Sequence, residues 1–375
     1  MKKKIAIIGS GIGGLTAANL FIKNSDFEIM VYEKEQMLSL DEGYGIQLAT
    51  NSVSILNKIG FRDIGSSDIF NPLKINFYSN NNKICDLNLE RFNNNSVKYT
   101  TLQRSTLIEF LKDKLFTNNF RFGKEVRKVS KIKDKLLINF TDNTNSLVDF
   151  IIVSDGVFSK TKSIVENKTI KPRYNGSIAI RSVIKFSEEF NYERKNISLI
   201  MFPNAHVVIY PINKKNNFNL LCIAREKLSQ NYDIRSIIEK KILSKNKNLE
   251  NLFKDDIKLW PTYVSKKPIR SIYDNVFYLG DAFYTFVPAL AQGASQSIEA
   301  SHELFNLLSE NKKNIQNLYF KKRLKRINQI NKRSKFNYFG FHISNAFLQN
   351  LRNFFLRRLV KNKNFIQSYL GKIYK

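Results

Sequence analysis

The sequence has little of what builds small secreted or metal-bound scaffolds. Its 375 residues include two cysteines, Cys85 and Cys222. Two cysteines so far apart form no disulfide framework, and they lack the close spacing of zinc ligands. We therefore expect no metal site and a reducing compartment, which makes the predicted location cytoplasmic.

Long apolar runs are absent as well. No stretch reaches the roughly 18 consecutive apolar residues that cross a bilayer, so no transmembrane helix is expected. The chain begins with a methionine and three lysines, as a signal peptide could, but the apolar run that follows spans only residues 5–8. The sequence thus predicts that this run is a strand of the fold and not a leader.

Acidic residues are scarce, with 32 Asp and Glu against 61 Lys and Arg. Residues 311–375 contain 17 Lys and Arg and no Asp or Glu. Two interpretations of this positive charge stay open. It can reflect a biased composition spread over solvated faces, or residues 313–375 can form a surface that docks on the inner face of an anionic membrane. Nucleic acid is disfavoured as a partner because no nucleic-acid-reading motif accompanies the charge.

The N-terminal segment has the pattern of a βαβ unit. Residues 4–8 form an apolar run typical of a buried parallel strand, and residues 15–22 place small and apolar side chains at helical spacing. Residues 28–33 predict the second strand. The strand and the helix are joined by Gly9-Ser10-Gly11-Ile12-Gly13-Gly14.

A phosphate-binding turn needs its glycines for separate reasons. One makes the turn, one lets a pyrophosphate approach the backbone, and one lets the helix pack on the strand. Gly9, Gly11 and Gly14 fit these roles, and free amides at the helix start would face the anion. Glu33 can accept hydrogen bonds from ribose hydroxyls and would repel a 2′-phosphate. The combination predicts a dinucleotide site.

The rest of the chain alternates strands with Asn-rich turns and ends in helices. A helix is predicted over residues 234–247 and another over 292–309. The C-terminal helical region carries Phe347, Leu351, Phe354, Phe355 and Leu359 on one face. Strands are predicted over residues 73–90, 97–103, 121–129, 136–140, 147–153, 177–186, 198–211, 217–225 and 276–279.

Two later turns follow predicted strands. One contains Asp155 and Gly156, and the other contains Gly280 and Asp281. An Asp in the second position can bind ribityl hydroxyls, and the amides of a helix that begins near Gln292 can hold the electron-rich edge of a flavin ring.

These motifs, in this order, resemble the class A flavoprotein monooxygenases, the family with the para-hydroxybenzoate hydroxylase fold, and most closely its salicylate hydroxylase-like branch. Residues 42–51, 102–107 and 288–299 are similar to three further segments of that branch. The resemblance covers roughly residues 1–310. It implies FAD as cofactor, NADH or NADPH as electron donor, and O2. The implied reaction hydroxylates a phenol or an aromatic acid through a flavin C4a-hydroperoxide.

The implied fold is α/β. A Rossmann-like FAD domain of the glutathione reductase type would comprise residues 1–72, 98–172 and 266–312. An interleaved antiparallel-sheet substrate domain would comprise residues 73–97 and 173–265, followed by the basic helical region 313–375.

The resemblance also implies a set of cofactor-binding residues. The glycine turn and Glu33 would bind the ADP half of FAD, Arg104 the ribityl-phosphate, Asp281 the ribityl chain, and residues 292–294 the flavin ring. Asp155 and Gly156 would serve both FAD and NAD(P)H. The full set is Gly9, Gly11, Ile12, Gly13, Gly14, Glu33, Lys34, Gly45, Gln47, Arg104, Asp155, Gly156, Gly280, Asp281, Pro288, Gln292, Gly293 and Ala294.

The sequence departs from the family at three places. Lys162 replaces a common Arg, which weakens an expected pyridine-nucleotide contact. Residues 283–285, Phe-Tyr-Thr, replace Ala-His-Pro beside the flavin, and Thr50 replaces a proline.

On the substrate side, strand alternation places His206 and Tyr210 on one face, where they could bind and deprotonate a phenol. Arg181 or Arg225 could clamp a substrate carboxylate, and Tyr284 could line the substrate site. Each of these residues could instead have a structural role, satisfied by its neighbours.

Other functions stay open at this point. One is a membrane-associated hydroxylase or epoxidase of a lipid-soluble ring such as a ubiquinone precursor. Another is a non-catalytic flavin-binding protein. A flavin-dependent halogenase is disfavoured because Trp260 is the one tryptophan. The sequence leaves the oligomeric state open.

Overall fold

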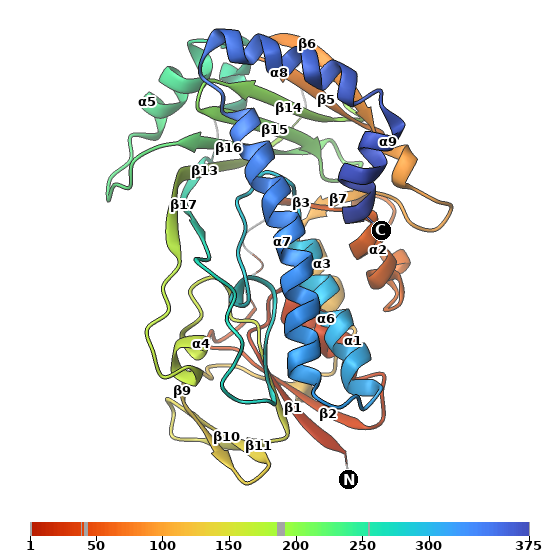
Figure 1. The fold of residues 1–375 in the computed structure, drawn as a ribbon, viewed down its shortest axis with the longest axis vertical. Helices are drawn as coiled ribbons and strands as arrows, with labels where there is room; N and C mark the ends of the chain where they lie inside the picture. Colours follow the sequence, from red (N-terminus) through yellow and green to blue (C-terminus); the bar gives the residue numbers. More distant parts are fainter. Residues whose placement is uncertain (1, 39, 41–43, 186–191, 254–255, 375) are drawn as a thin grey trace.

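A computed structural model of the chain describes residues 2–38, 40, 44–185, 192–253 and 256–374. A parallel sheet with its helices occupies one end of the molecule, and a large, mostly antiparallel sheet occupies the other (Figure 1). The long helix α7 (Ile315–Phe341) runs from the first end to the second. The predicted α/β architecture with an interleaved sheet domain is confirmed, while the residue boundaries of the domains stay a prediction.

The parallel sheet has apolar strands because both of its faces are covered. Side chains such as Ile5 and Ile7 pack against helices α1, α3 and α6, and Ala6 and Ile8 pack against a small antiparallel sheet. The parallel order is β18 (Val276–Tyr278), β12 (Phe150–Val153), β1 (Lys3–Ile8), β2 (Phe27–Tyr32) and β8 (Phe120–Arg121). The helices are α1 (Ile12–Phe21), α3 (Arg104–Asp113) and α6 (Gly293–Ser309), and the small sheet is β11 (Asn145–Val148), β10 (Lys135–Phe140) and β9 (Val126–Ile132).

The large sheet takes its strands from two separate parts of the chain, as the interleaved prediction requires. A three-stranded sheet joins it to the helical end. The large sheet runs β17 (Lys258–Val264), β13 (Arg173–Lys185), β16 (Asn217–Arg225), β15 (Ala205–Pro211), β14 (Ile197–Phe202), β5 (Lys74–Ser79) and β6 (Asn82–Asn88). The joining sheet is β3 (Gly45–Leu48), β7 (Thr100–Gln103) and β4 (Ile69–Phe70). Shorter elements are α2 (Thr50–Asn57), α4 (Lys160–Val165) and 3-10 turns at Phe61–Asp63, Glu90–Phe92, Thr117–Asn119 and Gly280–Ala282.

The prediction of one strand over residues 198–211 is wrong. That segment is a hairpin of β14 and β15, in which Phe202 faces Ala205 across a turn formed by Pro203 and Asn204. Asn204 has a φ of 62°, a left-handed conformation that asparagine tolerates. Because both strands are buried on both faces, the apolar pattern runs almost unbroken across the segment, and Pro203 and Asn204 were its one turn signal.

Two other predicted elements differ in their limits. The helix expected over residues 234–247 is divided into α5 (Ile234–Ile238), a π-helical turn (Glu239–Leu243) and a 3-10 segment (Lys247–Phe253). The strand expected over residues 177–186 begins earlier, at Arg173, and residue 186 lies outside the described residues.

The C-terminal region is built into the fold. After α7 come α8 (Ala346–Leu359), α9 (Lys363–Ile366), a π-helical turn (Gln367–Gly371) and α10 (Lys372–Tyr374). Ile373 and Tyr374 are buried in the core beside the large sheet, and Arg326 donates to the carbonyl of Ile373 at 2.6 Å. Thr50 donates to the carbonyl of Tyr374, also at 2.6 Å. In the described residues, no helix has both the length and the apolar character that crossing a bilayer requires.

Candidate functional site

Three predicted turns meet at the carboxyl edge of the parallel sheet. The amide of Ser154 donates to the carbonyl of Ile8 at 2.8 Å, and the amide of Leu279 donates to the carbonyl of Val153 at 2.9 Å. The ends of β1, β12 and β18 therefore lie side by side. In open α/β sheets, this edge is where ligands bind.

The glycine turn after β1 is closely packed on one side and open on the other. A Cβ atom at Gly14 would lie 2.0 Å from the carbonyl oxygen of Gly9, and one at Gly13 would lie 2.4 Å from Leu279. A Cβ atom at Gly11 would meet nothing within 4 Å. Gly11 and Ile12 start α1, so the open side faces the first amides of that helix.

Glu33 belongs to the same turn in space. Its carboxylate accepts hydrogen bonds from the amide and the hydroxyl of Ser10, at 2.9 and 2.5 Å. The acidic side chain thus stands beside the open side of the glycine turn, where a ribose could reach it. Lys34, the next residue, is exposed and forms an ion pair with Glu35 at 3.2 Å.

Asp155 lies in the second turn with one oxygen unused. Its Oδ2 accepts from the amide of Thr161 at 3.2 Å, whereas its Oδ1 is buried without a partner in the described part of the chain. Burial raises the pKa of the Asp155 carboxyl group. Gly156, with a φ of 84°, has open space at the position of a Cβ atom.

The third turn carries Asp281, which keeps some exposed surface. Burial raises the pKa of its carboxyl group to about 6, although the positive charge of Lys162 acts in the opposite direction. Gly280, with a φ of 58°, allows the turn to pack against Ser297.

The structure explains the departure at Lys162. The side chain is buried, and its ammonium group donates to the carbonyl of Ala282 at 2.6 Å. The pKa of the Lys162 ammonium group is lowered by burial, and the negative charges of Asp155 and Asp281 offset part of this decrease. In this structure Lys162 therefore fixes the Gly-Asp-Ala turn from inside.

The loop from Pro288 to Ala294 ends at the start of α6. Ala291 has a φ of 50°, an unusual conformation for alanine, and such strain tends to occur at functional sites. The Oε1 atom of Gln292 accepts from Asn51 and Gln296 at 3.4 and 3.1 Å. Its Nε2 atom is buried without a partner among the described residues, and a Cβ atom at Gly293 would stand in open space.

The C-terminal region holds this loop in place, which the sequence did not indicate. Asn337 of α7 donates to the carbonyl of Ala289 at 3.0 Å, and Tyr369 donates to the amide oxygen of Asn337 at 2.7 Å. These contacts join residues far apart in the chain. The sequence offers one weak signal of this support, which is that Asn337 and Tyr369 are polar residues within largely helical segments.

The segment that replaces Ala-His-Pro also packs against α7. Phe283 is buried against Tyr319 and Phe320, and the hydroxyl of Tyr284 accepts from Asn331 at 3.0 Å. Tyr284 is therefore held by its ring and by its hydroxyl, and burial raises its pKa.

The strand β3 carries Gly45 and Gln47 to the large sheet. A Cβ atom at Gly45 would lie 2.8 Å from Tyr210, so the missing side chain permits this approach. Gln47 accepts from Tyr99 at 2.8 Å and stands beside the Tyr210 hydroxyl. Arg104 starts α3, donates its amide to the carbonyl of Tyr44, and forms no ion pair within the described residues. Residues 42 and 43 of the predicted glycine-rich segment lie outside the described residues.

Arg181 is a cation beside this group. Its guanidinium lies 5.9 Å from the ring centres of both Tyr44 and Trp260, and its charge partly offsets the rise that burial causes in the pKa of Tyr210. The structure thus brings together Arg181, Tyr210 and Gln47. Arg225 lies elsewhere, with its guanidinium over the ring of Tyr338 at 5.4 Å.

His206 shares a face of β15 with Tyr210 but has different neighbours. Its Nδ1 atom lies 2.7 Å from Nε2 of His342, at the end of α7. Burial lowers the pKa of His206 to about 3 and lowers that of His342 as well. Both rings are therefore neutral near pH 7, and one of the two facing nitrogens donates to the other.

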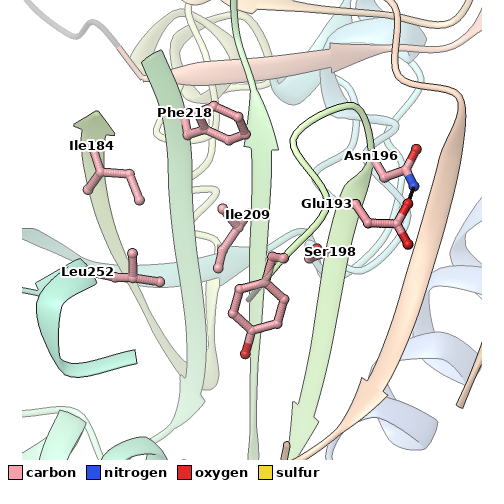
Figure 2. A pocket seen from close by; sticks show the side chains of 8 residues that line it. Ile184, Glu193, Asn196, Ser198, Ile209, Phe218 and Leu252 are labelled. Atoms are coloured by element: carbon pink, nitrogen blue, oxygen red, sulfur yellow. Dashed lines mark hydrogen bonds between the residues drawn. The ribbon is translucent and has the colours of Figure 1, made fainter. Parts of the chain in front are cut away.

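Two hollows lie outside these loops. A small cavity on the opposite face of the large sheet, shown in Figure 2, is lined by Ile184, Ser198 and Ile209 and has a volume of about 10 Å³. That volume is too small for anything larger than a water molecule. An open cleft of about 620 Å³ lies between α2, α6 and α7 and is lined by charged residues including Lys58 and Glu299. Among the described residues, no three His, Cys, Asp or Glu side chains gather as metal ligands.

The loops at the sheet edge fit a flavin dinucleotide. The glycine turn offers amides and open space for a pyrophosphate, and Glu33 stands beside it for a ribose. Asp155 and Gln292 offer buried polar atoms that lack partners in the described chain, as groups that await a ligand would.

Two glycine variants separate packing from ligand binding. Gly11→Ala should leave the fold intact, because its Cβ atom meets nothing, but should weaken FAD binding at least about tenfold by blocking the pyrophosphate. Gly14→Ala should destabilise the protein, because its Cβ atom collides with Gly9. Circular dichroism and FAD titration would measure both effects, and wild-type FAD affinity in Gly11→Ala would place the pyrophosphate elsewhere.

Asp281 should give FAD binding a pH dependence. Ribityl hydroxyls that donate to its carboxylate would stabilise the ionised form, so its pKa would be lower in the complex than in the free protein. FAD affinity should therefore rise with pH up to about 6, the pKa of the free protein, and then level off. Flavin fluorescence titrations on both sides of that pH would measure the rise.

The control for this experiment is Asp281→Asn, which has nearly the same shape and does not titrate. Its FAD affinity should be lower and should not change across the same pH range. An equal rise in the variant would assign the pH dependence to another group.

Comparisons with known proteins agree with this geometry. The sequence profile of the family described as "FAD binding domain" matches residues 2–334. The 3-amino-4-hydroxybenzoate 2-monooxygenase of Streptomyces cremeus is 24% identical, over 79% of this chain and 76% of that protein. The 6-hydroxynicotinate 3-monooxygenase of Pseudomonas fluorescens is also 24% identical, over 82% of this chain and 83% of that protein.

Solved structures show the same fold. Klebsiella pneumoniae HpxO, complexed with FAD and uric acid, has a TM-score of 0.86 at 19% identity, over 98% of this chain and 97% of that chain. A salicylate hydroxylase in a substrate complex has a TM-score of 0.79 at 16% identity, over 100% of this chain and 97% of that chain. The match to the family profile, which spans most of the chain, confirms the predicted resemblance: the chain belongs to the FAD binding domain family and is an FAD-dependent monooxygenase.

Proposed function

We propose that this monooxygenase hydroxylates a small aromatic ring that carries a carboxylate and a hydroxyl, with NADH or NADPH and O2 as co-substrates. The observation that carries the proposal is the position of Arg181, beside Tyr210 and Gln47 and over two aromatic rings. The names of two relatives, which act on 3-amino-4-hydroxybenzoate and 6-hydroxynicotinate, describe rings with both groups.

The FAD contacts follow from the loops at the sheet edge. Gly9, Gly11, Ile12, Gly13 and Gly14 would hold the pyrophosphate. Glu33, with Lys34 nearby, would bind the ribose. Arg104 would contact the ribityl-phosphate, Asp155 and Gly156 would serve both FAD and NAD(P)H, and Gly280 and Asp281 would lie along the ribityl chain. The ring would contact Gly45 and Gln47 on one strand and Pro288, Gln292, Gly293 and Ala294 on the loop.

Bound FAD supplies the redox and oxygen-transfer chemistry, and the chain positions the ring that reacts. Arg181 would bind the carboxylate through its planar fork, which the rings of Tyr44 and Trp260 keep oriented. Tyr210 stays protonated because burial raises its pKa, so its hydroxyl can donate to the substrate. Tyr284, held by Asn331, would close another side of the site.

His206 would accept the proton of the ring hydroxyl. Its imidazole is neutral near pH 7, but the burial that lowers its pKa to about 3 also makes it a weak base. The transfer therefore requires that His342, 2.7 Å from its Nδ1 atom, stabilise the cation that forms. Loss of this proton makes the ring electron-rich at the position that is hydroxylated.

A second partner that we propose is an anionic membrane surface, which the basic region 313–375 would contact. The absence of Asp and Glu after residue 310 supports this proposal. The substrate itself need not be lipid-soluble for this contact to form.

The proposed substrate class has a direct test. The purified protein should show a flavin spectrum, acid should release FAD, and hydroxylated aromatic acids should stimulate NADH or NADPH oxidation with formation of a hydroxylated product. Arg181→Gln should raise KM for these acids at least about tenfold, since the bidentate carboxylate contact is lost. The matched control is a phenol without a carboxylate, whose KM should change little. Equal losses for both compounds would remove Arg181 from carboxylate binding.

The role of His206 is tested by His206→Ala. Hydroxylation should fall at least about a hundredfold, a usual contribution of general base catalysis, while FAD stays bound. His302, which lies 2.8 Å from Lys58 on the helical side of the molecule, offers the control His302→Ala with unchanged turnover. Wild-type turnover in His206→Ala would exclude His206 from the mechanism.

A further inference from the structure

Helix α8 exposes most of its large apolar side chains, unlike an ordinary surface helix. It crosses the outer edge of the large sheet and contacts β6 (Figure 1). None of its 14 residues is buried. The large apolar side chains on its outer face are Phe347, Leu348, Leu351, Phe354 and Phe355, which are 41–73% exposed. A surface helix usually buries such a stripe and exposes its polar face.

The inner face of α8 packs Leu356 against the core beside the large sheet and is anchored by polar side chains. The guanidinium of Arg352 donates to the carbonyl of Gly340 at 3.1 Å and to the hydroxyl of Ser79 at 3.0 Å. Arg357 donates to the carbonyl of Ile84 at 3.3 Å. Rolling the helix to bury its apolar stripe would break these bonds and leave the partly buried Arg352 without them. The outward direction of the stripe is therefore a fixed property of the fold.

The charges that the C-terminal region itself places around this stripe have one sign. Arg357 and Arg358 are exposed at the last turn of α8, and the guanidinium of Arg358 lies 3.8 Å from the ring centre of Phe354. Lys361 and Lys363 follow, and both are exposed. No acidic residue occurs from position 311 to the end of the chain.

The end of α7 extends the same apolar character. Phe336 and Phe339 are 62% and 60% exposed, and Lys332 and Lys335 are exposed beside them in the sequence. A scattered exposed apolar residue needs no explanation, but a concentration of aromatic side chains in one short part of the chain indicates an interaction surface.

We propose that α8 is a membrane-docking helix that lies in the interface of an anionic bilayer. Its aromatic and leucine side chains would enter the boundary of the acyl chains, and Arg357, Arg358, Lys361 and Lys363 would contact the head groups. This inference rests on the proposed membrane partner and assigns the contact to one helix and one face. A second copy of the chain is a poorer partner for this face, because two such surfaces would bring like charges together.

Vesicle co-sedimentation of the full-length, FAD-loaded protein tests the assignment. Vesicles of phosphatidylcholine with phosphatidylglycerol should bind the protein, and vesicles of phosphatidylcholine alone should bind it at least about tenfold more weakly. Phe354→Ser with Phe355→Ser should reduce binding to the mixed vesicles at least about tenfold, and so should Arg358→Gln with Lys361→Gln. High salt should weaken the interaction of the wild type, because it screens the charges.

Matched variants at the other end of the molecule provide the controls. Phe116 is 71% exposed, close to the 73% of Phe347, so Phe116→Ser and Phe347→Ser remove equally exposed rings. Arg127 and Lys128 are exposed cations, as Arg358 and Lys361 are, so the paired glutamine variants remove the same charge. Binding should fall for the α8 variants and stay unchanged for the controls. Each variant should retain its flavin spectrum, which shows that the fold is intact.

Three results would overturn the inference. The first is equal binding to neutral and mixed vesicles or to neither, and the second is an equal loss in the control variants. The third is a dimer in solution that the α8 variants dissociate, which would identify a second copy as the occupant of this face. These measurements need no substrate, so they fail or succeed independently of the proposed hydroxylation.

Discussion

The close contact between the turn after β1 and the start of α1 sets the geometry on which the rest of the site depends. Helix and strand can approach this closely because Gly14 has no side chain, and the approach points the first amides of α1 toward open space at Gly11. The turns after β12 and β18 then stand beside it, since their strands are neighbours in the same parallel sheet. One backbone contact thus brings three separate turns to a single ligand.

The C-terminal region completes what the parallel sheet begins. A loop with a strained residue such as Ala291 keeps its shape only when its surroundings hold it. Here Asn337 of α7 donates a hydrogen bond to the carbonyl of Ala289. Tyr369, which follows α8 in the sequence, donates a hydrogen bond to Asn337. The last helix is fixed in turn by Arg326 and Thr50. The flavin loop and the end of the chain therefore belong to one packed unit.

The departures from the family pattern have physical explanations in this unit. The ammonium group of Lys162 donates a hydrogen bond to the carbonyl of Ala282 in the Gly-Asp-Ala turn. This single bond does not need the planar, forked guanidinium of the arginine that is common in the family. Phe283 and Tyr284 pack against α7, so this segment is joined to the C-terminal region by an aromatic contact and by the hydrogen bond from Asn331. The same α7 ends at His342, which faces His206. The loop segment and the histidine pair thus both depend on the position of α7.

Local patterns determined much of this protein. The alternation of apolar run, glycine turn and helix specified the βαβ unit, and strand ends followed by Asp and Gly specified the turns at the sheet edge, because each signal lies within a few neighbouring residues. Contacts between distant residues could not be read in this way. The pairing of His206 with His342, the support of Ala289 by Asn337, and the hairpin at Asn204 depend on how buried strands and helices pack. The stripe on α8 shows the limit most clearly. Its periodicity gave the helix and its apolar face, but only the anchoring of Arg352 and Arg357 by the tertiary structure decided that this face points outward.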